Sequence, residues 1–266
     1  MSDRAFVCFC VDGQSDIDAL KVPFEDLFDQ VGHDDIDVRF RFADFQHKNH
    51  GDITSMAGVT TGNIEKTIYK YYFKNVDKRT ELGWEDVTTI IHIIDLDGAY
   101  VPEEKIKLFT AAEQARADNL VTAGKPKNTL YLEDHIAVRS NLLQRQETLQ
   151  RKRKNIEYLL SLDEITVGKR KVRYALYFFS CNLDHFLHGD ANMTGTEKMR
   201  HAANFSSMVT DADSLVAYFT DNEFCTECDY EQSWKALRRD TASLQRGSNI
   251  HLLIKRILSS DIADWT

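Results

Sequence analysis

The feature that most constrains the fold is a run of almost entirely β-branched residues from Val87 to Ile94. β-branched side chains favour the extended backbone of a strand. An uninterrupted apolar run, Ala5 to Val11, also lacks helical spacing. Strands without polar alternation are typical of parallel sheets that helices cover on both faces. The chain is therefore expected to contain a sheet that is buried on both sides.

The segments between these strands have helical periodicity, which predicts an α/β fold with a mostly parallel sheet flanked by helices. The predicted domains are a core of residues 1–118, a polar, basic helical insertion of residues 119–172, and a region of residues 173–266 with the last core strand and a helical C-terminal third. Further strands are expected at Val38 to Phe42 and Tyr174 to Phe179, and helices at Ser15 to Gly32, after Thr61, at Glu103 to Ala117, at Asp134 to Leu162 and from Thr194 onward.

The charge balance excludes one class of function. The chain has 33 Lys and Arg against 42 Asp and Glu, a formal charge of −9, which excludes a uniformly basic coat for nucleic acid. No run approaches the roughly 18 apolar residues of a membrane span, and the start of the chain lacks a secretory cleavage site. These patterns predict a cytoplasmic protein without a membrane partner.

Acidic residues stand where two of the predicted strands end. Asp12 and Asp16 follow the first strand, and Asp95 and Asp97 follow the strongest one. The carboxyl ends of parallel strands form the ligand crevice of an open sheet, and an extended backbone would point Asp95 and Asp97 to the same side. Four converging carboxylates repel one another unless a divalent cation compensates, and oxygen ligands favour Mg²⁺ or Mn²⁺. The alternative is that these residues serve only as turn and cap residues.

This arrangement resembles the TOPRIM domain, which topoisomerases, primases and nucleases of the overcoming-lysogenization-defect type share. The resemblance covers residues 5–100 and the strand at 174–180, with an insertion between them. It implies that Asp12 acts in acid/base chemistry and metal binding, that Asp95 and Asp97 hold Mg²⁺ or Mn²⁺, and that Asp16 supports the metal. The family's first acid is normally Glu, and Asp12 is one methylene shorter.

The segment Ser180 to His188 resembles the polar element after the later strand in TOPRIM-like effectors of bacterial anti-phage systems. By that resemblance Asn182, Asp184 and His188 would reach the same crevice. The alternative is that Asn182 caps a helix and His185 packs beside it. His92 lies inside the strongest strand and is predicted to be a core histidine with a satisfied hydrogen bond.

A basic arm stands out on this acidic chain. Residues 139–173 contain ten basic and four acidic residues, a local charge of +6. Such asymmetry favours phosphate contacts on one surface, with DNA, tRNA or another RNA as partner; the alternative is a solvated helix face. The second basic cluster precedes a strand and is expected near the acidic site. The candidate nucleic-acid-binding residues are Arg151, Lys152, Arg153, Lys154, Lys169, Arg170 and Lys171.

The leading hypothesis is a metal-dependent TOPRIM-type endonuclease that acts in antiviral defence by abortive infection. Because the chain has no P-loop motif, the resemblance implies a separate ATPase subunit; a homodimer is a further candidate assembly. Two alternatives stay open. Asp95 and Asp97 also resemble motif I of haloacid-dehalogenase-type phosphatases, with Asp95 as nucleophile and Asp97 as acid/base, although Ala99 stands where that family has Thr. The other alternative is a catalytically degenerate TOPRIM-like sensor or binding subunit.

Overall fold

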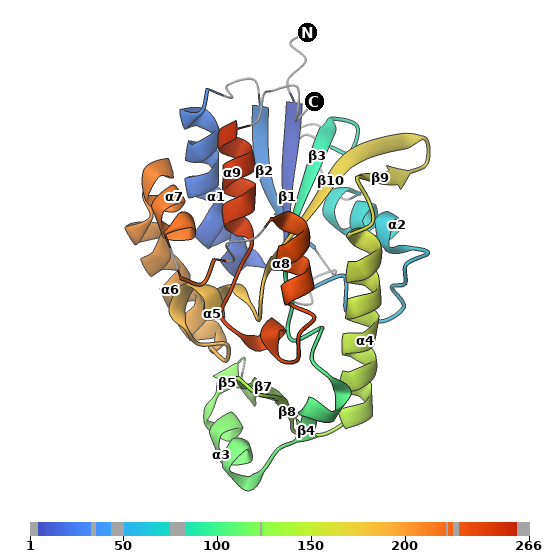
Figure 1. Cartoon of the computed structure of the whole chain (residues 1–266), viewed down its shortest axis with the longest axis vertical. Helices are drawn as coiled ribbons and strands as arrows, with labels where there is room; N and C mark the ends of the chain where they lie inside the picture. Colours follow the sequence, from blue (N-terminus) through green and yellow to red (C-terminus); the bar gives the residue numbers. More distant parts are fainter. Residues whose placement is uncertain are drawn as a thin grey trace.

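The computed structural model describes residues 5–32, 36–43, 51–74, 83–122, 124–221, 223–225 and 229–259. A central sheet has the strand order β2-β1-β3-β10-β9 (Figure 1). Its first four strands are parallel, and β9 pairs antiparallel with β10 at one edge. The predicted mostly parallel α/β fold is confirmed at this level. The strands are β1 Ala5–Val11, β2 Ile36–Phe42, β3 Val87–Asp95, β9 Glu164–Val167 and β10 Arg170–Phe179.

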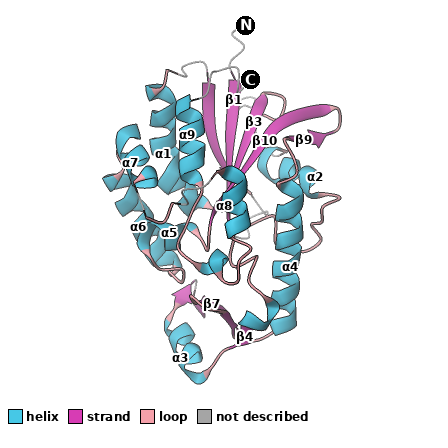
Figure 2. Cartoon of the chain, in the orientation of Figure 1, coloured by secondary structure: helices cyan, strands magenta, loops and turns pink. Residues whose placement is uncertain are grey.

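Helices cover both faces of this sheet (Figure 2). Along β1, Phe9 packs on one face while Cys8 and Cys10 pack on the other, and all three side chains are fully buried. Burial on both faces explains why the strand reads as an uninterrupted apolar run. The helices on the Phe9 face include α1 Gln14–Gln30, α5 Leu183–His188, α6 Gly195–Met208, α7 Ala212–Thr220 and α9 Ile250–Ser259.

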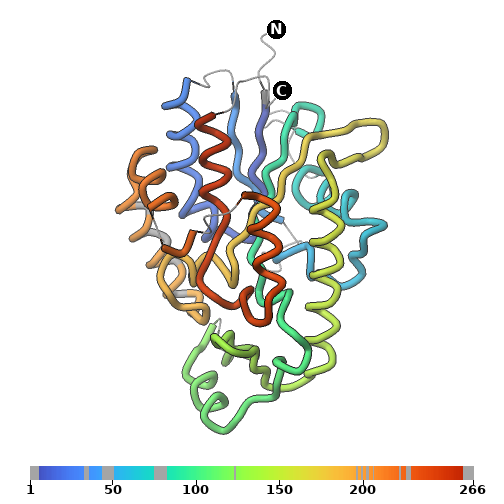
Figure 3. Tube along the Cα trace, in the orientation of Figure 1, coloured from blue at the N-terminus to red at the C-terminus, as the bar shows by residue number. Residues whose placement is uncertain are grey.

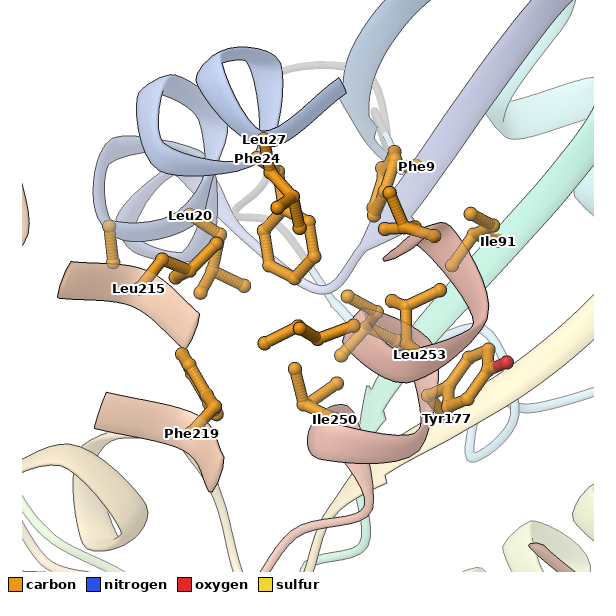
Figure 4. Packing of buried hydrophobic residues seen from close by; sticks show 14 of the residues in the cluster. Phe9, Leu20, Phe24, Leu27, Ile91, Tyr177, Leu215, Phe219, Ile250 and Leu253 are labelled. Carbon is orange, nitrogen blue, oxygen red and sulfur yellow. The ribbon is translucent and has the colours of Figure 1, made fainter. Parts of the chain in front are cut away.

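Aromatic and aliphatic side chains fill the core between the sheet and α1, α7 and α9 (Figure 4). Phe9 stacks on Phe40 with ring centroids 4.5 Å apart, and Phe24 of α1 tilts against Phe9 at 5.2 Å. Pro23 lies inside α1 without ending it. The predicted helix at Ser15 to Gly32 is therefore one helix in the structure.

The opposite face is covered by α2 Ile64–Ile68, the π-helical turn η1 Tyr69–Phe73, the end of α4 Leu142–Leu159, and α8 Tyr230–Ala236. Trp234 of α8 meets Phe178 of β10 at a ring distance of 4.7 Å. Ile156 and Leu159 of α4 are fully buried in the same cluster. The helical C-terminal third thus contributes to both layers.

The insertion forms a second, smaller sheet beyond the carboxyl ends of the central strands (Figures 1 and 3). Its order is β4-β8-β7, where β4 precedes residue 119, so this unit begins earlier than the predicted boundary. The pairing of β9 and β10 also returns residues 164–172 to the central sheet. The elements of the insertion before α4 are η2 Glu103–Lys105, β4 Ile106–Leu108, α3 Ala111–Asn119, β5 Val121–Thr122, β6 Lys125–Pro126, β7 Thr129–Tyr131 and β8 Ile136–Val138.

Two of the predicted helices in this region are partly wrong. The segment Glu103 to Ala117 contains a short 3₁₀ turn and a strand before α3, whose start is capped by Thr110. The segment Asp134 to Leu162 becomes helical only at Leu142, because Ile136 to Val138 pair with two strands and are buried. In both cases tertiary pairing overrides local propensity. Within the described residues, no helix combines the length and the apolar composition needed to cross a membrane.

Gly98 fixes the turn that follows β3, and its replacement tests this packing. The backbone has φ +76°, and an added Cβ would lie 2.5 Å from Ile136 Cδ1 of β8. Gly58 has φ +81° with open space around it, so Gly58→Ala is a control for backbone strain alone. We expect Gly98→Ala to reduce the free energy of unfolding by about 2 kcal/mol more than Gly58→Ala, measured by urea denaturation. Equal losses would contradict this packing.

Candidate functional site

The candidate site lies where the connections of two neighbouring strands diverge. β1 leads into α1 on one face of the sheet, whereas β3 leads into the insertion, whose helix α4 covers the other face. Such a switch point opens a crevice at the carboxyl ends of the strands. Asp12 directly follows β1, and Asp95 is the last residue of β3. The strand order therefore brings together two acids that are distant in sequence.

Backbone hydrogen bonds fix the first group of acids. The amide of Asp95 donates to Asp12 Oδ2 at 3.1 Å, and the amide of Leu183 donates to Asp95 Oδ1 at 2.9 Å. Asp16 accepts from the Gly13 amide at 2.8 Å, which closes the start of α1. Asp12 Oδ1 is buried and has no hydrogen-bond partner among the described residues. We call Asp12, Asp16 and Asp95 the acid triad.

The acid triad is electrostatically strained. Burial raises the pKa of Asp95 well above its ordinary value, and the charges of Asp16 and Asp12 raise it further. Burial likewise raises the pKa of Asp12, to which the Asp52 charge contributes, and raises the pKa of Asp16 to about 6. Carboxylates that are buried close together favour either bound protons or a compensating cation. The triad is therefore prepared to bind positive charge.

Asp97 was predicted to lie with the other acids, but in the structure it lies apart from the triad. Its backbone is left-handed, with φ 50°, because the strand ends at Asp95 and the alternation of an extended chain no longer applies. Asp97 Oδ2 lies 2.8 Å from Lys152 Nζ, and Oδ1 accepts from the Tyr131 hydroxyl at 2.9 Å. Burial alone would raise the pKa of Asp97, but Lys152 and Arg145 outweigh it and lower the pKa. Both carboxylate oxygens are thus engaged by the insertion.

Lys152 is the cation at the centre of this second group. Its side chain is 1% exposed, and Nζ lies 2.9 Å from Asp52 Oδ2 as well as 2.8 Å from Asp97 Oδ2. The prediction that Lys152 binds nucleic acid is therefore wrong, because its ammonium group is buried between two carboxylates. Asp52 was missed because no local pattern connects residue 52 with a helix one hundred residues later.

The other basic residues that were predicted to bind nucleic acid lie in two separate regions of the structure. Arg151 donates to the Ser55 carbonyl at 2.9 Å and Arg153 to the Ala99 carbonyl at 2.9 Å, so both attach α4 to the core, whereas Lys154 is exposed. Lys169, Arg170 and Lys171 lie at the start of β10, the end of the strand remote from Phe179, which pairs with Asp95. The expectation that this cluster lies near the acidic site is wrong, because β10 runs its full length between them.

The helix cap that the simpler alternative predicted for Asn182 is present, whereas Asp184 lies close enough to Asp16 for its charge to raise the pKa of Asp16. Asn182 caps α5 by accepting from the His185 amide at 2.9 Å, and the ring of His188 lies 4.5 Å from that of His201. Asp184 forms an ion pair with Lys198 of α6. Lys198 is a site residue that no sequence pattern indicated, and its charge acts to lower the pKa of both Asp16 and Asp95.

His92 is confirmed as a core histidine, but only one of its two ring nitrogens is satisfied, because Nε2 has no partner among the described residues. It is fully buried, and its Nδ1 lies 2.8 Å from the Tyr174 hydroxyl. Burial lowers the pKa of His92 to about 4, so the ring is neutral at physiological pH. His92 therefore contributes hydrogen bonding to the core and no charge to the site.

The acid triad fits a divalent cation in its donor chemistry. Carboxylate oxygens are the preferred ligands of Mg²⁺ and Mn²⁺, and Asp12 Oδ1 is a buried acceptor without a partner. Across the described ranges, no three His, Cys, Asp or Glu side chains are already gathered in a metal-binding arrangement. The triad therefore offers the ligand type, and its carboxylates would have to draw closer around an ion.

Comparisons with protein-family models, with curated proteins and with solved structures found no match for this chain.

Removing the buried lysine tests the second group of charges. In Lys152→Met the carboxylates of Asp52 and Asp97 lose their shared cation. Because an unpaired buried charge is costly, we expect the free energy of unfolding to fall by about 3–5 kcal/mol. Lys154→Met removes a charge two residues away from an exposed position of the same helix, and we expect a change within about 0.5 kcal/mol. Similar losses in both variants, measured by chemical denaturation, would contradict the assigned role of Lys152.

Proposed function

We propose that this chain is a Mg²⁺- or Mn²⁺-dependent nuclease of the TOPRIM type that hydrolyses phosphodiester bonds in DNA or RNA. The observation that carries the proposal is the contact between Asp12 and Asp95 at the switch point, with Asp16 beside them. Three partly buried carboxylates whose pKa values are raised, chiefly by desolvation, and one unpartnered oxygen are unfavourable in an apoprotein, but they suit a cation that a phosphate could share.

Each member of the triad has a separate role in this proposal. Asp12, Asp16 and Asp95 would hold the ion, which supplies positive charge to polarise a phosphoryl group when it is bound. Asp12 also has an oxygen without a partner, and burial raises its pKa, which is the direction that favours a general base. It would accept the proton of the attacking water.

The neighbouring cations complete the charge balance. Lys198 lies close enough to the triad to lower the pKa of Asp16, so it can offset the charge of a bound phosphate. Lys152 forms ion pairs with both Asp97 and Asp52 and is therefore a positioning residue. In this proposal Asp97 orders the turn after β3, and the metal ligands are the triad.

The phosphatase alternative requires a protonated Asp97. A general acid must carry a proton before it reacts, but Lys152 and Arg145 lower the pKa of Asp97 and keep it ionised. The nuclease proposal has no such requirement. The TOPRIM resemblance extends it to an effector of anti-phage defence that works with a separate ATPase subunit.

Cleavage assays on plasmid DNA and on total tRNA, with Mg²⁺ or Mn²⁺, test the proposal. We expect Asp95→Asn and Asp12→Asn each to lower the cleavage rate at least about 100-fold, because each removes a charge from the triad. Asp18→Asn changes an exposed acid on the first turns of the same helix α1 and should leave the rate unchanged. A chelator should abolish cleavage by the wild type.

Two results would contradict the nuclease. One is wild-type cleavage by both triad variants. The other is hydrolysis of p-nitrophenyl phosphate, lost in Asp95→Asn, with neither nucleic acid cut; it would favour the phosphatase.

A further inference from the structure

The strand β2 forms one side of the central sheet (Figure 1), and in the described part of the chain no strand pairs with its outer edge. β2 pairs with β1 over all seven of its residues, without a register shift. Sheets commonly protect such an edge with a bulge, a Pro or Lys residues, and β2 contains no Pro or Lys. We call this outer side of β2 the β2 edge. It is a regular backbone edge, of the kind to which a further strand adds.

β2 is accessible along its first half. A hollow of about 310 Å³ is lined there by residues 36–39 of β2 together with Glu25 and Asp29 of α1. The side chains of Asp37 and Arg39 are 20% and 51% exposed. The lining contains three acidic residues and one basic residue, so the hollow favours an incoming cationic side chain.

The side chains of β2 make the strand complementary to a second copy of itself. Asp37 and Arg39 lie on one face of the strand, on either side of Val38 in the sequence. When a second copy runs antiparallel with the two Val38 residues opposite each other, each Asp37 lies opposite Arg39 of the other copy. On the face that α1 covers, Ile36 lies opposite Phe40 of the other copy, and Phe40 is only partly buried in the single chain. One register therefore matches both faces.

The adjacent registers of this pairing are unfavourable. If the two strands were centred on Asp37, the two Asp37 carboxylates would lie opposite each other, and if they were centred on Arg39, the two guanidinium groups would. Like charges directly opposite each other destabilise a pair of strands. An offset of one residue would place Val38 opposite a charged side chain. Charge and polarity therefore select the register centred on Val38.

The charges select the register, whereas the attraction between the copies has another source. In the single chain Arg39 Nη2 already lies 3.0 Å from Asp37 Oδ1 of the same strand. Pairing would exchange these ion pairs, one in each chain, for two pairs between the copies, and exposed ion pairs contribute little to stability. The added backbone hydrogen bonds along the β2 edge and the covering of Phe40 would supply the attraction.

We propose that the β2 edge is the interface of a homodimer, in which the β2 strands of two copies pair antiparallel about Val38 and join the two central sheets into one. Such an interface is isologous, so each contact occurs twice. Arg39 of each copy would enter the hollow of the other, beside Glu25 and Asp29. The proposal does not depend on the proposed nuclease function, because strand pairing requires neither the acid triad nor a metal.

Charge reversal at the β2 edge tests the interface. Asp37→Arg and Arg39→Asp each place two pairs of like charges opposite each other in the homodimer, so we expect each variant to raise the dissociation constant of the dimer at least about tenfold. An equimolar mixture of the two variants restores two pairs of opposite charge, and a heterodimer should form within about threefold of the wild-type affinity. Recovery in the mixture would show that the losses do not come from misfolding.

The measurement is sedimentation velocity of the full chain over about 1–100 µM protein, without metal or nucleic acid. The matched control is Lys66→Asp, which makes the same reversal of charge at an exposed position of α2 and should leave the dissociation constant within about twofold of wild type. A wild-type monomer over the whole range would overturn the proposal. So would a dimer that both β2 variants keep, a loss of equal size in Lys66→Asp, or a mixture that stays monomeric.

Discussion

The buried ion pairs of Lys152 are the interaction on which the site depends. One ammonium group joins Asp97 after β3, Asp52 before α2, and the middle of α4. These three segments are far apart in the sequence, and the pairs attach the insertion to the carboxyl edge of the sheet. A buried charge is tolerated only when its partners are in place, so the network fixes how the insertion lies over the crevice.

This network also determines which acidic side chains are left without an ion pair and could bind a metal. Lys152 and Tyr131 occupy both oxygens of Asp97, whereas Asp12 keeps a buried oxygen without a partner in the described structure. The acid triad is thus left with raised pKa values and with Lys198 as a nearby cation. Asp52 and Asp97 are thus paired with a buried cation, whereas the triad has no ion pair of its own among the described residues, and this difference is the physical basis for proposing a metal there.

The sequence predicted those features that depend on local patterns. The buried strands, the parallel sheet and the core position of His92 follow from apolar runs, and the capping by Asn182 follows from a hydrogen bond to a residue three positions later. The placement of Asp97 could not be predicted, because the turn after β3 takes a left-handed conformation that a two-residue alternation does not contain. The pairings of Lys152 and Lys198 join distant segments, and no local spacing marks them.

Calorimetric titration of the protein with Mn²⁺ tests most directly the central claim, that the acid triad binds a divalent metal. The account predicts binding to the wild type at pH 7.5 that weakens as the pH falls through about 6, where Asp16 takes up a proton and competes with the ion. It further predicts that Asp95→Asn binds at least about tenfold more weakly, while Asp97→Asn, whose carboxylate is already paired with Lys152, binds nearly as the wild type does. Equal binding by the wild type and Asp95→Asn, or no binding by the wild type, would contradict the assignment of the acid triad as a metal site.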